Sequence, residues 1–242
     1  MALVVWVFAG GGESEVRGLM PYLEGQYGAH SFIRKSPVRQ KPGPRPQRGN
    51  NPHRVQRSDL GYGRTGKSLA EQVGVILTRS LKGRDICDLI LIIDDLDCHD
   101  PGSRRKLFKN AINGVEAAAR IQRYVGFASP EVESWIVADW GNTIAKDADF
   151  KGSHQEMRHW LSTNESVLFD RPEEFSSLDT EKNSCREKLS DAIVESTIRC
   201  AARARYSKGT HTPRFLKQIS PEVVSGKCPF FRELHNHLSR LE

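Results

Sequence analysis

A cluster of carboxylates follows an apolar run in the middle of the chain, in the segment LILIIDDLDCHD at positions 89–100. Like charges at the end of a buried strand repel one another unless a cation compensates them. In an extended chain, residues two apart face the same side, so Asp95 and Asp97 converge on one Mg²⁺ while Asp94 points away. The pattern favours a metal site; the alternative is that these acids cap the next helix or bind arginines.

Two further pairs of acids also follow expected strand ends. Glu131 and Glu133 lie in SPEVESWIVAD at positions 129–139, and Glu13 and Glu15 follow a run of glycines. Glutamates in the first turn of a helix are favoured by the helix dipole, so a purely structural role competes with a chemical one. We expect both pairs to lie near the strand ends, on the same edge of the sheet as the aspartates.

The chain opens with VVWVFAGGGESE at positions 4–15, an apolar run that stops at three glycines and continues into a helix-like segment. Many α/β proteins present a reactive group at such a strand end, but the residue here is Ala9. The glycines partly fit the dinucleotide pattern G-x-G-x-x-G. Glu15 stands where the third glycine is needed, and no acidic ribose partner follows about 20 residues on, so dinucleotide binding is not predicted.

The segment GYGRTGKS at positions 61–68 matches the phosphate-binding pattern GxxxxGK[ST] in full. That loop requires a buried strand before it and a helix after it. A helix is expected here, but the preceding segment, HRVQRSDL, is polar and basic. We therefore interpret the match as a coincidence, in a glycine loop that caps a helix at Ser68.

Apolar periodicity predicts strands that alternate with helices, and hence an α/β fold with a mainly parallel sheet flanked by helices. The expected strands are 3–8, 89–93 and 123–127, and the expected helices are 13–23, 68–81, 104–120 and 130–140. We expect an α/β domain over 1–168 and a mainly helical extension over 169–242, which starts with a polar connection at 169–178.

Composition excludes several classes of protein. Hydrophobic residues make up 38% of the chain, and no apolar run approaches the ~20 residues that cross a bilayer. The first residues lack a basic leader, so we expect a cytoplasmic protein without a membrane anchor. The five cysteines form no CxxC pair, which indicates ordinary thiols in a reducing compartment and no zinc site. They are Cys87, Cys98, Cys185, Cys200 and Cys228.

Two stretches are basic and contain no acid. Positions 30–58 interleave arginine and lysine with proline, which predicts an extended or disordered loop. Positions 196–220 begin near IRCAARARY, a sequence compatible with a helix that has a basic face. With a net charge of +6, these stretches are a mild indication of nucleic-acid binding.

Taken together, these motifs resemble those of Toprim proteins. The chain is similar in particular to a bacterial family of unknown function, commonly encoded beside an AAA or ABC-type ATPase and associated with defence against phage. The Toprim pattern has a glutamate at the end of its first strand, where this chain has FAGGGE at positions 8–13, and a D-x-D motif that Asp95-Leu96-Asp97 matches. A later E-x-W-x-x-A-D signature matches positions 133–139, and the closing CPFFREL at 228–234 is also similar.

The resemblance implies a Toprim-like fold and Mg²⁺-dependent (or Mn²⁺-dependent) cleavage of phosphodiesters by a nuclease subunit. In it, Asp95 and Asp97 hold the metal, while Glu13 and Glu133 complete or orient the site. The departure is Ala9, which stands in the place of the expected glutamate. A methyl group neither binds magnesium nor moves a proton, so the chain is expected to be inactive as it stands, either as a degenerate copy or through an introduced Glu-to-Ala change.

The same resemblance implies a hetero-oligomeric complex with an ATPase and a DNA or RNA substrate. Basic residues would neutralise substrate phosphates, which gives salt-sensitive and largely sequence-independent binding. The predicted nucleic-acid-binding residues are Arg34, Lys35, Arg39, Lys41, Arg45, Arg48, Arg54, Arg57, Lys67, Arg203, Arg205 and Lys208. Two rival hypotheses remain: a non-catalytic nucleic-acid-binding or regulatory partner of an ATPase, and a nucleotide-binding enzyme that uses the loop at 61–68.

Overall fold

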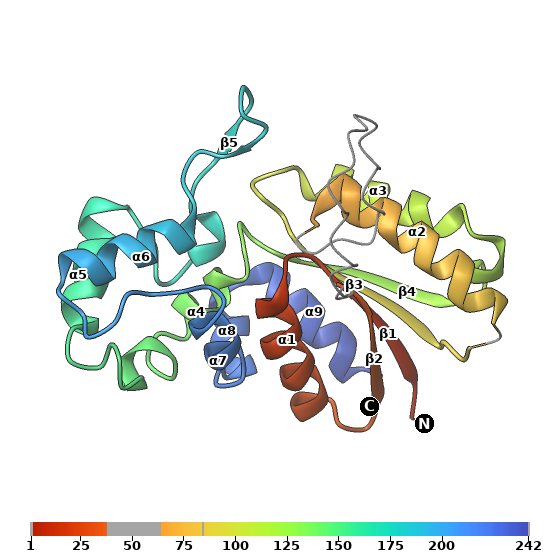
Figure 1. Cartoon of the computed structure of the whole chain (residues 1–242), viewed down its shortest axis with the longest axis horizontal. Helices are drawn as coiled ribbons and strands as arrows, with labels where there is room; N and C mark the ends of the chain where they lie inside the picture. The colour runs from red at the N-terminus through yellow and green to blue at the C-terminus, as the bar shows by residue number, and fades with distance from the viewer. Residues whose placement is uncertain (1, 38–63, 84, 242) are drawn as a thin grey trace, which may run out of the picture.

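The computed structural model describes residues 2–37, 64–83 and 85–241 of the 242-residue chain. In these ranges a central sheet carries helices on both faces, and α5 and α6 lie farthest from it, beyond the carboxyl ends of the strands (Figure 1). Within the same ranges no helix combines the length and the apolar character that a membrane-spanning helix requires.

The sheet has four strands in the order β2-β1-β3-β4. Their bounds are β1 Val4–Ala9, β2 Ser31–Ser36, β3 Leu89–Asp95 and β4 Gln122–Ala128. Every neighbouring pair is parallel, which confirms the predicted parallel α/β sheet. Because the strands run in the same direction, their carboxyl ends share one edge, where sheets of this kind place their sites.

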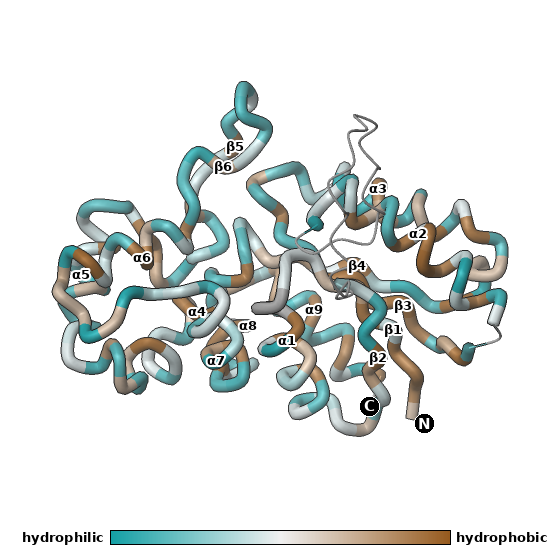
Figure 2. Tube along the Cα trace, in the orientation of Figure 1, coloured by the Kyte–Doolittle hydropathy of each residue, from teal (hydrophilic) through white to brown (hydrophobic). Residues whose placement is uncertain are grey.

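One face of the sheet packs against α1 (Glu13–Gln26) and α9 (Pro229–Ser239). Alternate side chains of β1 point to this face, and Val5, Val7 and Ala9 are all buried in its core. The hydrophobic segments gather along the strands in the hydropathy colouring of Figure 2. Burial of such side chains is the main source of stability, at about 1.5–3 kcal/mol for each large one.

The opposite face packs against α2 (Gly66–Lys82) and α3 (Pro101–Asn113). Trp6 and Phe8 of β1 point to this side and have no solvent exposure. Alternation along β1 therefore assigns each of its residues to one of two cores. Ala9 belongs to the core that contains α1 and α9.

The remaining helices are short. They are α4 Glu133–Ala138, α5 His154–Asn164, α6 Leu189–Arg199, α7 His211–Leu216 and α8 Pro221–Lys227, with 3-10 turns η1 Glu116–Ala118, η2 Ile144–Lys146 and η3 Pro172–Glu174. Residues before and after position 168, the expected boundary between domain and extension, share one hydrophobic core. Met157 and Leu161 lie in it together with Phe215 and Leu216.

A small hairpin, β5 (Leu178–Asp179) with β6 (Ser184–Cys185), projects from the body of the protein (Figure 1). A disulfide joins its Cys185 to Cys98, so the expectation of five ordinary thiols is wrong for this pair. The two cysteines are 87 residues apart, and a pairing over that distance leaves no local spacing signal. Cys87, Cys200 and Cys228 are free.

Several helices differ from their predicted bounds. The helix expected over 104–120 begins earlier, at Pro101, because the Asp100 side chain accepts a hydrogen bond from the Ser103 N–H at 2.6 Å and caps it. It ends at Asn113, and the chain continues into η1. The helix expected over 130–140 is shortened to α4.

The two basic stretches also differ from expectation. The prediction of a helix in IRCAARARY is wrong, because α6 ends at Arg199. Ala201 has a φ of 45°, which does not occur in a right-handed helix. Part of the stretch expected to be a loop is the edge strand β2. Positions 38–58 of that stretch lie outside the described residues.

Candidate functional site

Ala9 and Asp95 lie on adjacent strands and face the same side of the sheet. Ala9 pairs in register with Ile93, and both side chains belong to the core shared with α1 and α9. Asp95 follows Ile93 by two residues in β3, so its side chain points to the same face. A longer side chain at position 9 would extend into the side of the sheet that carries Asp95.

Asp94 points to the opposite face and acts as a structural anchor. It is 1% exposed, and its Oδ2 atom accepts a hydrogen bond from the Gly66 N–H at 3.0 Å and lies 3.4 Å from Arg104 Nη1. Burial raises the pKa of Asp94 to about 7, although Arg104 and the Gly66 N–H lower it. Gly66 has a φ of 54°, and a Cβ there would lie only 1.7 Å from Arg104 Nη1, so this approach requires glycine.

Asp97 does not lie where strand alternation places it. It follows the end of β3 with a φ of 48°, and its Oδ2 atom accepts a hydrogen bond from Thr65 Oγ1 at 3.2 Å. Asp95 instead accepts a hydrogen bond from the Val132 N–H at 3.1 Å. The rule that residues two apart converge holds only in an extended chain, and the left-handed residue breaks it. Burial raises the pKa of Asp97.

Glu131 and Glu133 enclose the ammonium group of Lys208. The Nζ atom of Lys208 lies 2.7 Å from Glu131 Oε2 and 3.2 Å from Glu133 Oε2. The two glutamates are 6% and 0% exposed. Burial by itself lowers the pKa of Lys208, but Glu133, Glu131 and Asp95 raise it well above its usual value. Lys208, which is partly exposed, is therefore the cation that pairs with two buried carboxylates, and we call this group the Lys208 cluster (Lys208, Glu131 and Glu133).

Hydrogen bonds from two other elements complete the Lys208 cluster. The backbone N–H and the hydroxyl of Ser190, in α6, donate to Glu131, the hydroxyl at 3.1 Å. The hydroxyl of Thr212, in α7, donates to Glu133 Oε1 at 2.7 Å. Buried charges need such partners, because an unsatisfied carboxylate is costly. The sequence indicated Lys208 as a ligand of nucleic acid, and no local pattern showed these glutamates as its partners.

The other predicted catalytic glutamate, Glu13, is the first residue of α1, and Glu15 lies in the same turn. Both follow the carboxyl end of β1 after the three glycines at positions 10–12. Their backbone is therefore near the same edge of the sheet as Asp95.

A cleft of about 690 Å³ adjoins Asp97, and we call it the Asp97 cleft. It lies where the first turns of α2 and α3 meet residues of the β5–β6 hairpin. Most of the residues that line it are polar, and two of them, Lys67 and Arg104, are cations. The lining residues are Thr65, Lys67, Asp97, His99, Asp100, Ser103, Arg104, Leu107, Leu178 and Asn183.

Four of the other residues predicted to bind nucleic acid lie in described segments, on β2 and in the segment after α6. Arg34 is exposed on β2, while Lys35 lies 3.4 Å from Asp85 and 3.8 Å above the ring of Trp6. Arg203 and Arg205 are exposed in the segment after α6. The other predicted ligands of nucleic acid lie outside the described residues, as do positions 61–63 of the glycine loop. These ligands are Arg39, Lys41, Arg45, Arg48, Arg54 and Arg57.

Across the part of the chain that the structure describes, no group of three or more His, Cys, Asp or Glu side chains is placed to hold a metal ion. The contacts explain why. Asp94 binds Arg104, Glu131 and Glu133 bind Lys208, and Ala9 supplies no ligand. In this arrangement the residues do not fit the Mg²⁺ that the Toprim resemblance implies.

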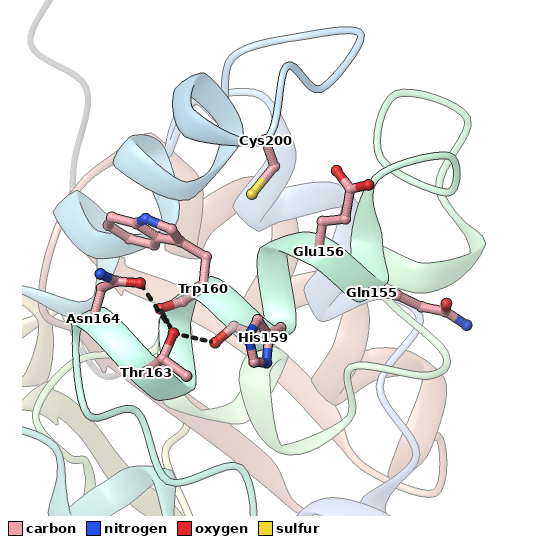
Figure 3. Close-up of a pocket in the computed structure, with 7 residues that line it drawn as sticks. All are labelled: Gln155, Glu156, His159, Trp160, Thr163, Asn164 and Cys200. Atoms are coloured by element: carbon pink, nitrogen blue, oxygen red, sulfur yellow. Dashed lines mark hydrogen bonds between the residues drawn. The ribbon is translucent and has the colours of Figure 1, made fainter.

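A separate cavity of about 480 Å³ lies along α5 and reaches the end of α6 (Figure 3). The hydroxyl of Thr163 donates to the backbone carbonyls of His159 and Trp160, so it is used within the helix. Burial and the charge of Glu156 raise the pKa of the Cys200 thiol. A lowered pKa activates a cysteine as a nucleophile, and the shift at Cys200 runs in the opposite direction.

The molecule is thus an α/β protein whose parallel sheet ends in an acidic edge beside a polar cleft. No protein family matches the chain, and neither the curated proteins nor the solved structures include a match.

Proposed function

We propose that this chain is a Toprim-like subunit of an ATPase-associated nuclease complex in anti-phage defence, and that Ala9 makes it inactive as it stands. One observation carries the proposal. Ala9 occupies the carboxyl end of β1, beside β3 and on the same face as Asp95. The position at which the Toprim pattern requires a glutamate is therefore a position from which a carboxylate would reach the acidic edge.

Two further features support it. A four-stranded parallel sheet flanked by helices is compatible with the Toprim resemblance. The Asp97 cleft brings Lys67 and Arg104 close to the same edge. Lys67 is exposed, and an exposed ammonium suits the phosphate oxygens of DNA or RNA. In this proposal Mg²⁺ or Mn²⁺ binds only when position 9 supplies a carboxylate.

The test is the substitution Ala9→Glu, with Ala9→Gln as a control of similar size and no charge. Each protein is incubated with DNA and with RNA, alone and together with the protein encoded beside it, in Mg²⁺ or in chelator. We expect metal-dependent cleavage by Ala9→Glu only. An inactive Ala9→Glu protein in the presence of its partner, or equal activity of Ala9→Gln, would contradict the proposal.

A second candidate function has its own observation in favour. Lys208 already forms ion pairs with Glu131 and Glu133, so these acids have a cationic partner within the protein. This arrangement suits a non-catalytic nucleic-acid-binding or regulatory partner of an ATPase. That function predicts that Asp95→Asn and Asp97→Asn leave complex formation and nucleic-acid binding unchanged. Removal of the basic positions 38–57 would abolish binding to nucleic acid.

A further inference from the structure

A covalent bond connects the candidate site to the β5–β6 hairpin. Cys98 follows Asp97 directly in the chain, and its sulfur is bonded to that of Cys185 in β6. Cys185 is 9% exposed, whereas Cys98 is half-buried. The disulfide therefore joins the loop that carries a candidate site residue to a segment 87 residues later in the chain.

The hairpin has few other attachments to this loop. Its strands pair only at Leu178 with Cys185 and at Asp179 with Ser184. The hydrogen bond from the Arg186 N–H to the Ser177 carbonyl, at 2.9 Å, joins the two arms of the hairpin to each other and not to the sheet. A two-stranded hairpin of this size is marginally stable by itself.

The position of the hairpin affects the Asp97 cleft. Leu178 and Asn183 of the hairpin line this cleft together with Lys67 and Arg104. His99 also lines it, and the backbone of Asn183 is among the groups that act on the pKa of His99. The hairpin is thus a part of the wall of the cleft.

The disulfide also restrains the turn at Asp97 and Cys98, whose backbone is strained. Asp97 and Cys98 have φ values of 48° and 60°, in a left-handed region that non-glycine residues rarely adopt. Such conformations persist only where the surrounding structure imposes them. A covalent bond at Cys98 is one such constraint, and it acts one residue away from the Asp97 carboxylate.

We propose that the Cys98–Cys185 disulfide is a redox-sensitive tether that holds the hairpin as a wall of the Asp97 cleft. In the reduced protein the hairpin moves away and the cleft opens toward substrate. Disulfides in reducing compartments are commonly redox-sensing. The tether rests on the geometry alone, whereas its control of substrate access rests on the proposed function.

The chemistry of the switch is thiol–disulfide exchange with a dithiol reductant. A thiolate of the reductant attacks Cys98 Sγ, which the partial exposure of Cys98 allows, and the Cys185 thiolate leaves and takes up a proton. The second thiol of the reductant then displaces Cys98, which also takes up a proton. Two electrons and two protons pass to the protein, and the reductant leaves as a disulfide. A small-molecule disulfide reverses the reaction.

Thiol counting tests the bond itself. Protein oxidised with glutathione disulfide and then denatured should present three free thiols, those of Cys87, Cys200 and Cys228, whereas reduced protein should present five. The Cys98→Ser variant should present four in both conditions, because Cys185 loses its partner. Five thiols in the oxidised protein would overturn the proposal.

Limited proteolysis tests the movement of the hairpin. Lys182, near the tip of the hairpin, is exposed, and so is Lys151, which is distant from it in the chain and provides an internal control. Tryptic cleavage after Lys182 should become roughly tenfold faster on reduction, because a local opening becomes more frequent, while cleavage after Lys151 stays unchanged. Cys98→Ser should behave as the reduced protein does and Cys87→Ser as the wild type does. Equal rates at Lys182 in both redox states would overturn the tether.

Access to the site is measured separately, in the Ala9→Glu background. Cleavage of nucleic acid by this variant should be faster in the reduced state than in the oxidised state, and the difference should disappear with Cys98→Ser. If Ala9→Glu is inactive in both states, the nuclease proposal fails, while thiol counting and proteolysis still decide the tether. If Ala9→Glu is active and indifferent to reduction, control of access by the tether is wrong.

Discussion

The ammonium group of Lys208 lies 3.2 Å from Oε2 of Glu133, a glutamate with no solvent exposure. The same ammonium lies 2.7 Å from Glu131, which comes from the same turn. These contacts join the segment after β4 to the segment between α6 and α7. A lysine side chain therefore supplies the positive charge at an acidic edge where the sequence predicts a divalent cation.

Removal of this charge should destabilise the protein. Lys208→Ala leaves two buried carboxylates without their cation, and we expect the free energy of unfolding to fall by roughly 2–3 kcal/mol at pH 7, less than for a fully buried pair because the lysine is partly exposed. The pKa of Lys208 is raised in the folded protein, so its charge makes its full contribution to the free energy of unfolding at neutral pH. This contribution is lost only as the pH rises above the usual pKa of a lysine. Urea denaturation measures the change.

The control for this prediction is Lys217→Ala. Lys217 is exposed, so its removal should change the free energy of unfolding by less than about 0.5 kcal/mol. If both variants unfold at the same urea concentration, the Lys208 cluster contributes nothing to stability.

The glycines after β1 provide a matched pair of substitutions. A Cβ on Gly10 would lie 2.5 Å from Oδ1 of Asp94 and 3.3 Å from its Cα, whereas a Cβ on Gly12 would have no atom within 4 Å. Gly10→Ala should displace the Asp94 carboxylate and lower the free energy of unfolding by about 1–3 kcal/mol. Gly12→Ala should change it by less than about 1 kcal/mol. Equal melting temperatures of the two variants would show that the Asp94 carboxylate can move away from a Cβ at position 10 without loss of stability.

Glu173 makes stability depend on pH. Burial raises the pKa of Glu173 to about 7, although its carboxylate accepts hydrogen bonds from the N–H groups of Phe230 and Phe231, at 2.9 and 3.3 Å, at the start of α9. The folded protein therefore holds this proton more tightly than the unfolded chain does. The stability from this group is largest in acid and falls as the pH rises from about 4.5 to about 7.

Glu173→Gln resembles the protonated form at every pH and so removes this dependence. We compare the free energy of unfolding of the variant with that of the wild type at each pH. From pH 4.5 to pH 8 this difference should shift in favour of the variant by on the order of 1–3 kcal/mol. Asp94, which titrates in the same range, is present in both proteins, so its contribution cancels. Urea denaturation at the two pH values checks this, and a difference that is constant with pH would show that Glu173 does not titrate there.

The strands show which parts of the fold are predictable. β1, β3 and β4 are recognisable because their apolar runs are too short for helices, and their parallel arrangement follows from the helices between them. β2 was missed because SFIRKS has only two apolar residues, Phe32 and Ile33, which two basic residues follow, and because it lies at the start of an acid-free stretch. As an edge strand it has one unpaired side, where exposed polar residues are tolerated.

The site is predictable only where it follows from the strand order. Parallel strands bring Ala9 and Asp95 to one edge whatever their distance in sequence. The contacts of Lys208 with Glu131 span 77 residues and depend on the packing of short helices, which local patterns do not record. The turn at Asp97 and the bond of Cys98 are likewise decided by tertiary contacts and not by composition.

Metal binding by the Ala9→Glu variant can be measured separately from cleavage. Ala9 is 3% exposed, so the carboxylate of Ala9→Glu would be largely buried beside Asp95. Without a divalent cation we expect this variant to lose roughly 2–4 kcal/mol in the free energy of unfolding, because two carboxylates then share a poorly solvated edge. Mg²⁺ should recover much of the loss, since a metal at about 100 times its Kd stabilises the folded state by about 2.7 kcal/mol.

Thermal unfolding in Mg²⁺ and in chelator measures this effect without any substrate. The melting temperature of Ala9→Glu should rise in Mg²⁺ by roughly 5–8 °C, that of the wild type should not change, and Ala9→Gln should resemble the wild type. Adding Asp95→Asn to Ala9→Glu should abolish the response. If Mg²⁺ stabilises none of these proteins, the acidic edge is not a metal site even with its expected carboxylate, and the lysine that pairs with Glu131 and Glu133 is then the cation of this edge.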